Sequence, residues 1–368
     1  MRRVFLFHAG LVQHYRIGVY NYLHAFLKKS GFELTIVTEG NQSGFDQQIE
    51  FPEIILNFSL PSLIKMVRNH QPWATILFIN HREEYFFPFL FYLRASGNKI
   101  ISWTHGINLQ DKGSLTSRLA HHLEHSLCDR IVLYSAPLKA YLLKSHRPKA
   151  YVANNTLNLL DFEPGKVDRQ ETLSKHNIKT RKNIVYSGRI TKRKRIQDLL
   201  SAFELLKDEN IGLILLGPDD DKILGQQIFD KSRLYYLGPV YGRKTLEILS
   251  ASDVCCIPGA IGLGIVDAMY CGLPVVTEKV PHGPEFIYFQ DGLTGYMVPE
   301  GDIASLAEKL KLLLTDDDLR TKMGEKAREE IMINGHVDRL AQGFLECLES
   351  LEEVKSPEGV QSEKVPKN

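Results

Sequence analysis

The stretch "DVCCIPGAIGLGIVDAMYCGLPVVT" (253–277) contains one complete structural unit of this 368-residue chain. An apolar run (253–258) leads into a glycine-rich loop, a helical segment (263–271) and a second apolar run (273–277). Continuously apolar strands joined through a helix are typical of a parallel sheet that is covered on both faces. Such sheets bind ligands beyond the carboxyl ends of their strands, so the loop at 259–262 is a candidate binding element.

The same alternation of apolar strands and helical segments continues on both sides of this unit. Candidate strands before it are 3–7, 33–38, 74–80, 99–104, 130–135 and 149–154, and those from the middle of the chain onward are 183–188, 211–217, 233–238, 253–258, 273–277 and 295–299. Helical patterns at 303–314, 317–333 and 337–352 end the folded part. The pattern predicts an α/β fold with two similar parallel-sheet domains.

Composition shifts suggest where these domains begin and end. We predict an N-terminal α/β domain at 1–160, a polar linker at 161–182 and a C-terminal α/β domain at 183–335. A last helix at 336–353 is expected to pack back on the N-terminal domain. The polar tail 354–368 is expected to be disordered.

Charge and composition exclude several classes of function. The chain has 45 Lys and Arg against 44 Asp and Glu, so it lacks the strongly basic balance of most nucleic-acid binders. No apolar run reaches the roughly 18–20 residues that span a bilayer. The five cysteines have no metal-like spacing, which favours a reducing cytoplasm.

One segment leaves contact with a membrane open. Residues 136–151 mix leucines with four basic side chains and predict an amphipathic helix. Such a helix could rest on the anionic inner face of a membrane, or it could be an ordinary surface helix.

The glycine loop (residues 259–262) precedes a helix, whose first amides have no partners inside the helix. Gly262, Leu263 and Gly264 would present these amides and a partial positive charge to a phosphate. On this stretch alone, a plain strand-to-helix turn is an equally good interpretation.

A second strand end, "SGRITKRKRIQDLL" (187–200), carries clustered cations. Arg189 follows the strand and Lys194 lies near the start of the next helix, where positive charge opposes the helix dipole. An anion bound between the domains would compensate for this. A solvated run of charges is the alternative, and it is the better interpretation for Lys192, Arg193 and Arg195.

The N-terminal half and one later turn add further candidates at predicted strand ends. His105 ends a buried strand and would face the cleft, and Gly10 follows the first strand. His14 and Arg16 open the following helix, and Glu285 follows a Gly-Pro turn.

The sequence contains no recognised metal-binding motif and no Walker or dinucleotide-binding motif. The segment "HHLEH" (121–125) places two histidines four residues apart, but it lies within a helix and is interpreted as a solvated face. There is no Walker sequence, no HExxH and no complete GxGxxG after the first strand. We therefore predict no metal site.

Taken together, these stretches resemble the family 4 retaining glycosyltransferases, which have the GT-B fold of two facing Rossmann-like domains with an interdomain cleft. The resemblance covers most of the chain and is strongest over 183–315. It implies that 1–160 is a Rossmann-like, acceptor-side domain and that 183–335 is a Rossmann-like, nucleotide-sugar-binding domain. The segment at 188–194 is similar to the family's Gly-Arg-Leu…Lys segment, which implies that Arg189 and Lys194 hold the donor's diphosphate. Asp267 is similar to the second acid of the family's paired acidic motif, which implies contact with the ribose hydroxyls. The first acid is replaced by Gly259.

The resemblance implies transfer of a hexosyl group, with retention, from a nucleotide-sugar donor to a hydroxyl of a glycan or lipid-linked glycan. It implies His105, Arg189 and Lys194 as catalytic residues, Gly10 and the 262–264 backbone as donor contacts, and no cofactor or metal. His14, Arg16 and Glu285 are candidates for the acceptor side or cleft. "HYRIGVYNYL" (14–23) and "WTHGINL" (103–109) are similar to members that build bacterial surface polysaccharides.

Other interpretations remain open. A sugar-nucleotide epimerase would share the two-domain architecture, and the glycine at 259 would also suit a catalytically silent nucleotide-sugar-binding protein. A nicotinamide dehydrogenase is disfavoured because GxGxxG is missing.

Overall fold

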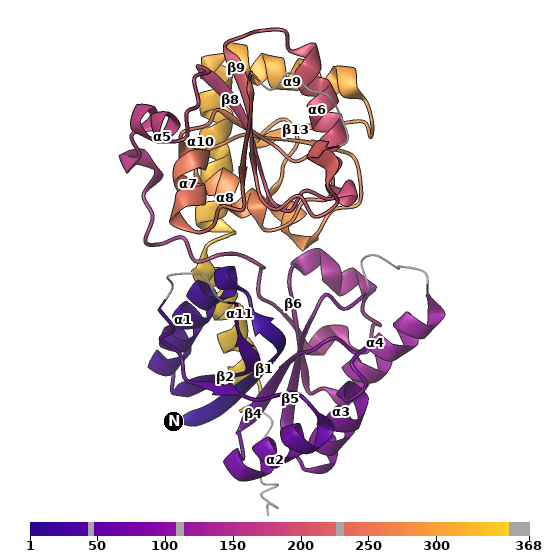
Figure 1. Ribbon diagram of the computed structural model, residues 1–368. Helices are drawn as coiled ribbons and strands as arrows, with labels where there is room; N and C mark the ends of the chain where they lie inside the picture. The colour runs from indigo at the N-terminus through magenta and orange to yellow at the C-terminus, as the bar shows by residue number, and fades with distance from the viewer. Residues whose placement is uncertain (43–47, 108–113, 226–231, 353–368) are drawn as a thin grey trace, which may run out of the picture.

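The computed structural model describes residues 1–42, 48–107, 114–225 and 232–352. The tail at 354–368, for which we predicted disorder, lies outside the described residues. Figure 1 shows two α/β halves, one above the other, with the chain start in the lower one. We call the lower one the N-terminal half and the upper one the C-terminal half.

The N-terminal half is built on a seven-stranded parallel sheet in the order β3-β2-β1-β4-β5-β6-β7. Its strands are β1 (Arg2–Val12), β2 (Phe32–Asn41), β3 (Glu53–Ile55), β4 (Ala74–Phe78), β5 (Lys99–Thr104), β6 (Arg130–Leu133) and β7 (Ala150–Val152). All were predicted except β3, which has only three residues and lies at the sheet edge.

Helices cover both faces of this sheet. They are α1 (His14–Lys29), α2 (Leu60–His70), α3 (Phe86–Ala95) and α4 (Leu115–Leu127). The amphipathic helix predicted over 136–151 was wrong: the chain forms two short 3-10 helices, η1 (Ala136–Tyr141) and η2 (Arg147–Lys149), before β7. Pro148 explains part of this, because proline lacks an amide proton and disfavours the helical conformation of the residue before it.

The C-terminal half has a six-stranded parallel sheet in the order β10-β9-β8-β11-β12-β13. Its strands are β8 (Lys182–Ser187), β9 (Ile211–Leu216), β10 (Leu234–Gly238), β11 (Val254–Cys256), β12 (Val275–Glu278) and β13 (Gly295–Val298). The sequence predicted each of them, because both faces of these strands are apolar.

The helices of this half are α5 (Arg169–Lys175), α6 (Ile196–Leu205), α7 (Arg243–Ser250), α8 (Gly264–Tyr270), α9 (Ile303–Thr315) and α10 (Asp317–Ile333), with the 3-10 helices η3 (Pro164–Lys166), η4 (Lys192–Lys194), η5 (Ile223–Gly225) and η6 (Pro284–Tyr288). The predicted apolar face of α6 is confirmed, because Ile196, Leu199 and Phe203 are buried. Asp302 and Asp316 begin α9 and α10 by accepting hydrogen bonds from amides three residues ahead.

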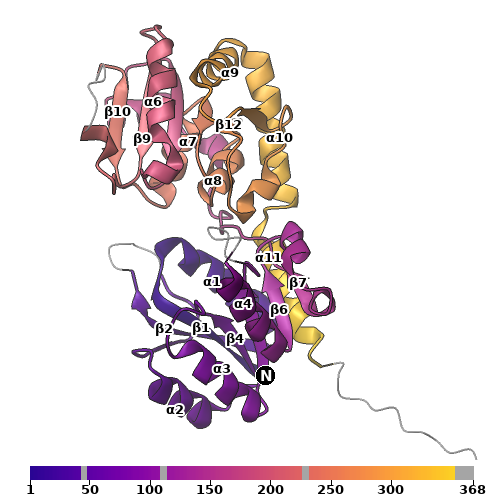
Figure 2. The same ribbon diagram turned by 90° about the vertical axis from the view of Figure 1, so that its right-hand side faces the viewer.

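The last helix, α11 (Val337–Glu349), returns to the N-terminal half and contacts α1, β6 and β7. Figure 2 shows it beside β6 and β7, away from the other C-terminal helices. Phe344 is completely buried there, with its ring 5.0 Å from that of Trp103. None of the described helices is long and apolar enough to cross a bilayer.

The chain passes between the halves near residues 153–158 and again near 334–336. The Thr156 hydroxyl donates to the carbonyl of Gly335, and the Asn154 side-chain amide donates to the carbonyl of Asn334 over 3.2 Å. The two connections are thus hydrogen-bonded to each other.

Candidate functional site

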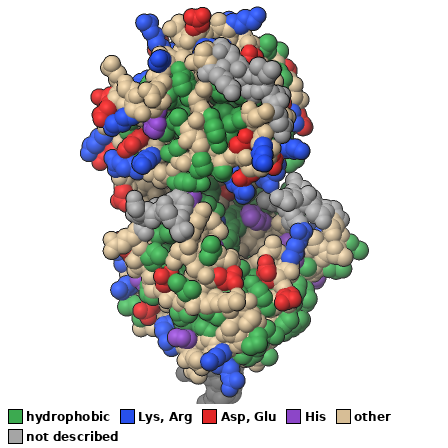
Figure 3. All heavy atoms as spheres, viewed as in Figure 1, with side chains coloured by type: hydrophobic (Ala, Val, Ile, Leu, Met, Phe, Trp, Pro, Cys, Tyr) green, Lys and Arg blue, Asp and Glu red, His purple; other side chains and the backbone are tan. Residues whose placement is uncertain are grey.

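A cavity of about 1630 Å³ lies between the two halves, at the carboxyl ends of strands from both sheets. Figure 3 shows the molecule hollowed at this level, with a histidine and basic side chains at the opening. Five predicted site residues line it, namely Gly10, His105, Lys194, Gly262 and Glu285. The other six do not: Arg189, Leu263, Gly264, Asp267, His14 and Arg16.

Backbone hydrogen bonds attach the glycine loop to the segment before α6. The amide of Gly259 donates to the carbonyl of Lys194 over 3.1 Å, and that of Ala260 donates to the carbonyl of Arg193 over 3.2 Å. Two strand ends distant in sequence therefore form one wall of the cavity.

The opposite edge of the loop is attached to residues 282–283. The amide of Ile261 donates to Nδ1 of His282 over 3.2 Å, and the amide of Gly283 donates to the carbonyl of Ile261 over 3.0 Å. A Cβ atom at Gly283 would lie 2.8 Å from that carbonyl oxygen, so glycine is needed for this approach. The loop is fixed on both sides.

This packing explains the departure at Gly259. A Cβ atom there would lie 2.3 Å from the carbonyl oxygen of Arg193 and 2.6 Å from Cα of Lys194. Real Cβ atoms do not approach backbone atoms this closely, so position 259 has no room for an acidic side chain.

The side chain of Lys194 contacts the glycine loop. Its Nζ donates to the carbonyl of Ala260, and an atom at the Cβ position of Gly262 would lie 3.7 Å from Nζ. Burial lowers the pKa of Lys194 to about 8, as does the charge of Arg193, while Glu285 acts in the opposite direction. A cation kept in a partly desolvated site is suited to an anionic ligand.

The backbone beyond the loop offers further donors. No hydrogen bond from the amides of Gly262 and Leu263 is found within the described part of the chain. Gly264 begins α8, and a Cβ atom there would lie 2.8 Å from the carbonyl oxygen of Ser187, so the start of α8 rests against the end of β8.

Arg189 lies apart from this arrangement. Its side chain is 74% exposed, and its Nε donates to the Asp220 carboxylate over 2.6 Å. The predicted position just after β8 holds, but the guanidinium is directed to the loop after β9 and does not line the cavity.

Asp267 lies in the first turn of α8, and its residue is only partly accessible. Burial raises the pKa of its carboxyl to about 7. No cation among the described residues offsets this effect. Its expected contact with ribose hydroxyls stays a prediction.

On the opposite wall, His105 stacks on Tyr134 with ring centroids 4.3 Å apart. Burial lowers the pKa of His105 to about 4, and the charge of Arg16 acts in the same direction, so the ring is neutral near pH 7. A neutral imidazole can exchange hydrogen bonds with sugar hydroxyls.

Arg16 supports this wall from behind. Its guanidinium lies 4.9 Å from the ring centre of Trp103, and its Nη2 donates to the Tyr134 hydroxyl over 3.5 Å. Arg16 is buried and lies outside the cavity lining, so it can position His105 through Tyr134 without contacting a substrate.

Two further N-terminal candidates have distinct positions. Gly10 has a φ of +78°, a conformation that favours glycine, and its amide donates to the carboxylate of Glu39 over 2.8 Å. The His14 ring lies 4.6 Å from that of Tyr241 in the other half, so it contacts the second half beside the cavity and not within it.

Glu285 in η6 is buried and faces the cavity. Its Oε1 accepts a hydrogen bond from Nδ2 of Asn155, which lies where the chain crosses between the halves. Burial raises the pKa of the carboxyl, whereas Asn155 and the nearby charges of Arg16 and Lys194 oppose this effect.

The interpretation of 121–125 as a solvated helix face was wrong. His121, Glu124 and His125 are buried, whereas the apolar side chains of α4 face outward, with Leu119 57% exposed and Leu123 also exposed. His121 and Glu124 line the cavity together with His81, which follows β4. Periodicity alone could not reveal this group, because here the polar face of the helix is the buried one.

Comparison with known proteins agrees with this architecture. The family model described as glycosyl transferases group 1 matches residues 168–330. The chain is 28% identical over 246 residues to N-acetyl-alpha-D-glucosaminyl L-malate synthase of Bacillus anthracis, covering 63% of each chain. It is 24% identical over 221 residues to the capsular polysaccharide biosynthesis glycosyltransferase CapM of Staphylococcus aureus, covering 55% of this chain and 56% of CapM.

The matched part therefore spans about three fifths of the length of these relatives. Among solved structures, HepE of Anabaena in complex with UDP superposes with a TM-score of 0.77 at 18% identity, over 95% of this chain and 100% of HepE. That likeness confirms the predicted fold class of two facing Rossmann-like domains.

Proposed function

We propose that this chain, a group 1 glycosyl transferase by its residues 168–330 and of the GT-B fold, transfers a hexosyl group from a nucleotide-sugar donor to a hydroxyl of a glycan or lipid-linked glycan. The anomeric configuration is retained, and the product belongs to a surface polysaccharide. Lys194 carries the proposal, because its partly buried ammonium lies against the glycine loop inside the interdomain cavity.

The size and lining of the cavity support a reaction between two substrates. A volume of about 1630 Å³ exceeds the roughly 300–1,000 Å³ of most single-ligand pockets. The wall formed by Lys194 and Gly262 suits the diphosphate, and the wall formed by His105 and Gly10 suits the donor sugar. A uridine nucleotide is the first donor to test, because HepE was solved with UDP-glucose as well as with UDP.

The proposed reaction breaks the bond between the anomeric carbon and the diphosphate oxygen while the acceptor oxygen forms a new bond on the same face. The proton of the acceptor hydroxyl moves to an oxygen of the departing phosphate. The protein stabilises the charge that develops on that phosphate through Lys194 and the amides of Gly262 and Leu263. These groups take the place that a divalent metal has in other transferases, so the diphosphate needs no metal here.

Arg189 can bind the diphosphate only after its ion pair with Asp220 is broken. An exposed ion pair of this kind stabilises a protein by about 0–1 kcal/mol, so exchange of the carboxylate for a diphosphate has a small cost. Position 259 cannot hold an acidic side chain, so Glu285 is the carboxylate that we assign to contact with the donor sugar or the acceptor.

The function is tested in two stages with purified protein. A thermal-shift screen against UDP-, GDP-, ADP- and dTDP-sugars identifies the donor, and release of the nucleoside diphosphate is then followed with and without glycan acceptors. Lys194→Ala is expected to lower turnover by about 10²–10³-fold, since it removes charge stabilisation of the leaving group. Arg189→Ala is expected to lower turnover as well.

Lys207→Ala, at an exposed lysine after α6, is the control and should turn over like the unmodified protein. Normal turnover of Lys194→Ala would refute the diphosphate assignment. An epimerised donor recovered without transfer would support a sugar-nucleotide epimerase, and tight donor binding with neither product would support a silent binding protein.

We further propose that the protein works in the cytoplasm and contacts the membrane peripherally. Tyr141 and Leu143 are exposed beside the exposed Lys144, and His146 hydrogen-bonds His122 of α4, whose leucines also face outward. Sedimentation with anionic vesicles, but not with zwitterionic ones, is the expected result. Equal recovery with both kinds of vesicle would contradict it.

A further inference from the structure

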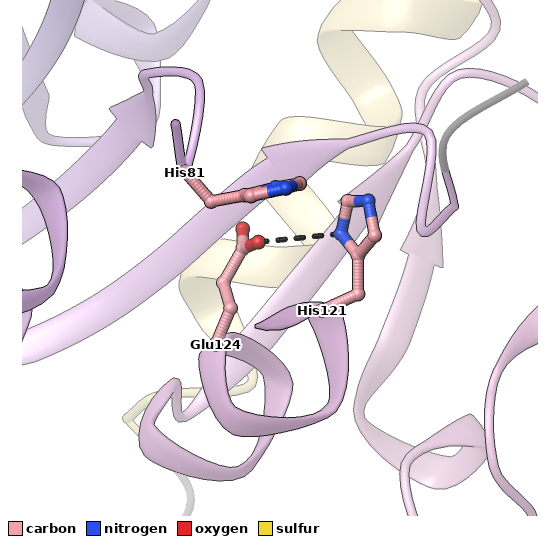
Figure 4. A group of neighbouring side chains, drawn as sticks. All are labelled: His81, His121 and Glu124. Carbon is pink, nitrogen blue, oxygen red and sulfur yellow. Dashed lines mark ion pairs between the residues drawn. The ribbon is translucent and has the colours of Figure 1, made fainter. Parts of the chain in front are cut away.

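Three side chains that commonly bind metals converge on the N-terminal wall of the cavity. His81 follows β4, and His121 and Glu124 lie one turn apart on α4. One potential ligand atom from each of the three lies within 4.8 Å of the others. Figure 4 shows the two imidazole rings and the carboxylate directed toward a common point.

The imidazole of His121 is buried beside the cavity, and its polar atoms lack hydrogen-bond partners within the described part of the chain. The residue is 8% exposed, and its Nε2 has no hydrogen-bond partner among the described residues. Its Nδ1 lies 3.4 Å from Oε2 of Glu124, a long contact for a buried pair. Burying an imidazole without partners costs free energy, which a bound ion would recover.

Glu124 is held in place by a neighbour on the sheet. The hydroxyl of Ser102 on β5 donates to Oε1, so Oε2 remains directed to the histidines. Hydrogen-bonded support of a ligating carboxylate is the usual outer layer of a metal site.

We propose that His81, His121 and Glu124 bind one divalent transition-metal ion of the zinc type, with a remaining coordination position open to the cavity. Two imidazoles and one carboxylate form the three-ligand set that leaves a fourth position for water or a substrate oxygen. Bonds of about 2.0–2.2 Å place tetrahedral ligands roughly 3.3 Å apart. The His121–Glu124 contact of 3.4 Å already has this spacing, whereas a separation at the 4.8 Å limit must shorten by about 1.5 Å. His81 is on a loop and can supply this movement.

This site is distinct from the diphosphate site, because its three ligands come from the N-terminal half, whereas Lys194 and the glycine loop come from the C-terminal half. The open position would take a water molecule or a hydroxyl oxygen of the acceptor. The inference goes beyond the proposed function, and its first test needs no sugar donor.

The test uses the full chain with any histidine tag removed and with metal stripped by a chelator. Calorimetric titration with Zn²⁺ should show one site per chain, and Co²⁺ should give the visible absorption of a four-coordinate ion. His81→Ala and His121→Ala should each weaken Zn²⁺ binding by at least about 10–100-fold. Ser102→Ala should weaken it by about 10–100-fold through loss of support to Glu124.

His122→Ala is the matched control, because His122 is on the same helix but outside the group. It should bind Zn²⁺ like the unmodified chain. Absence of stoichiometric uptake by the unmodified chain would overturn the proposal, as would undiminished binding in a folded His81→Ala variant. Zinc uptake without any sugar transfer would leave the proposal standing and count only against the proposed function.

Discussion

The close approach of residues 193–194 to Gly259 shows how one position can determine the chemistry of a wall. The backbone carbonyls of Arg193 and Lys194 accept from the loop amides, and this approach brings Nζ of Lys194 to the carbonyl of Ala260. An acid at 259 would separate the two segments and move Lys194 away. The cavity thus has a partly buried cation beside a loop that carries no acidic side chain at 259.

The lowered pKa of Lys194 predicts how the affinity for nucleotide depends on pH. Because its pKa is lowered to about 8, the ammonium is charged below pH 8 and becomes neutral above it. Affinity for UDP should therefore be constant near pH 7 and should weaken by up to about tenfold per pH unit above pH 8. Calorimetry between pH 7 and 9 measures this. Lys194→Arg keeps its charge over that range and should show no such decline, and an identical decline in both proteins would contradict the role of Lys194.

At the scale of elements, α4 and α8 both depart from simple amphipathic patterns. The outward leucines of α4 accompany a buried polar face that lines the cavity. The short α8 carries Asp267 where its carboxyl is desolvated and lacks a compensating cation. Functional groups are commonly kept at such a cost in stability.

Asp267→Asn is expected to stabilise the protein and weaken nucleotide binding. The pKa is about 7 in the folded protein and near 3.8 in the unfolded chain, so the folded state binds the proton more tightly. Asp267 therefore costs nothing at low pH, and its cost grows from about pH 4 to 7 and is then constant at about 4 kcal/mol.

The melting temperature of Asp267→Asn should exceed that of the unmodified protein at pH 8 and should approach it at pH 4. Asp161→Asn, at an exposed carboxyl, is the control and should change neither value. Unchanged calorimetric affinity of Asp267→Asn for the nucleoside diphosphate would contradict the ribose contact.

At the scale of the whole molecule, the chain crosses the cleft twice, and α11 completes the core of the half where the chain began. Phe344 packs on Trp103, so a residue close to the C-terminus stabilises the N-terminal sheet. Phe203 of α6 is the counterpart in the C-terminal core.

Phe344→Ala should lower the stability of the N-terminal half by about 3–5 kcal/mol, because a buried aromatic ring is removed. Amide hydrogen exchange should become faster in β5 and β6 and remain unchanged in β8 and β9. Phe203→Ala should give the reverse pattern. The same exchange pattern in both variants would show that the two halves do not unfold separately.

The sequence by itself determined the alternation of strands and helices, because burial on both faces requires continuously apolar strands wherever in the chain they occur. The apolar face of α6 and the position of Lys194 near the start of that helix followed from the same local rules. The three-residue β3 is too short to give a periodic pattern, and Pro148 interrupts the helix that the pattern predicts at 136–151.

Only the tertiary structure decided which strand ends meet. Nothing near position 259 in the sequence shows that residues 193–194 occupy the space of its side chain, or that Asp220 holds Arg189 outside the cavity. His81, His121 and Ser102 likewise meet only because β4, β5 and α4 pack together. Periodicity reports which side of one element is buried, whereas a site between two halves depends on contacts among segments distant in sequence.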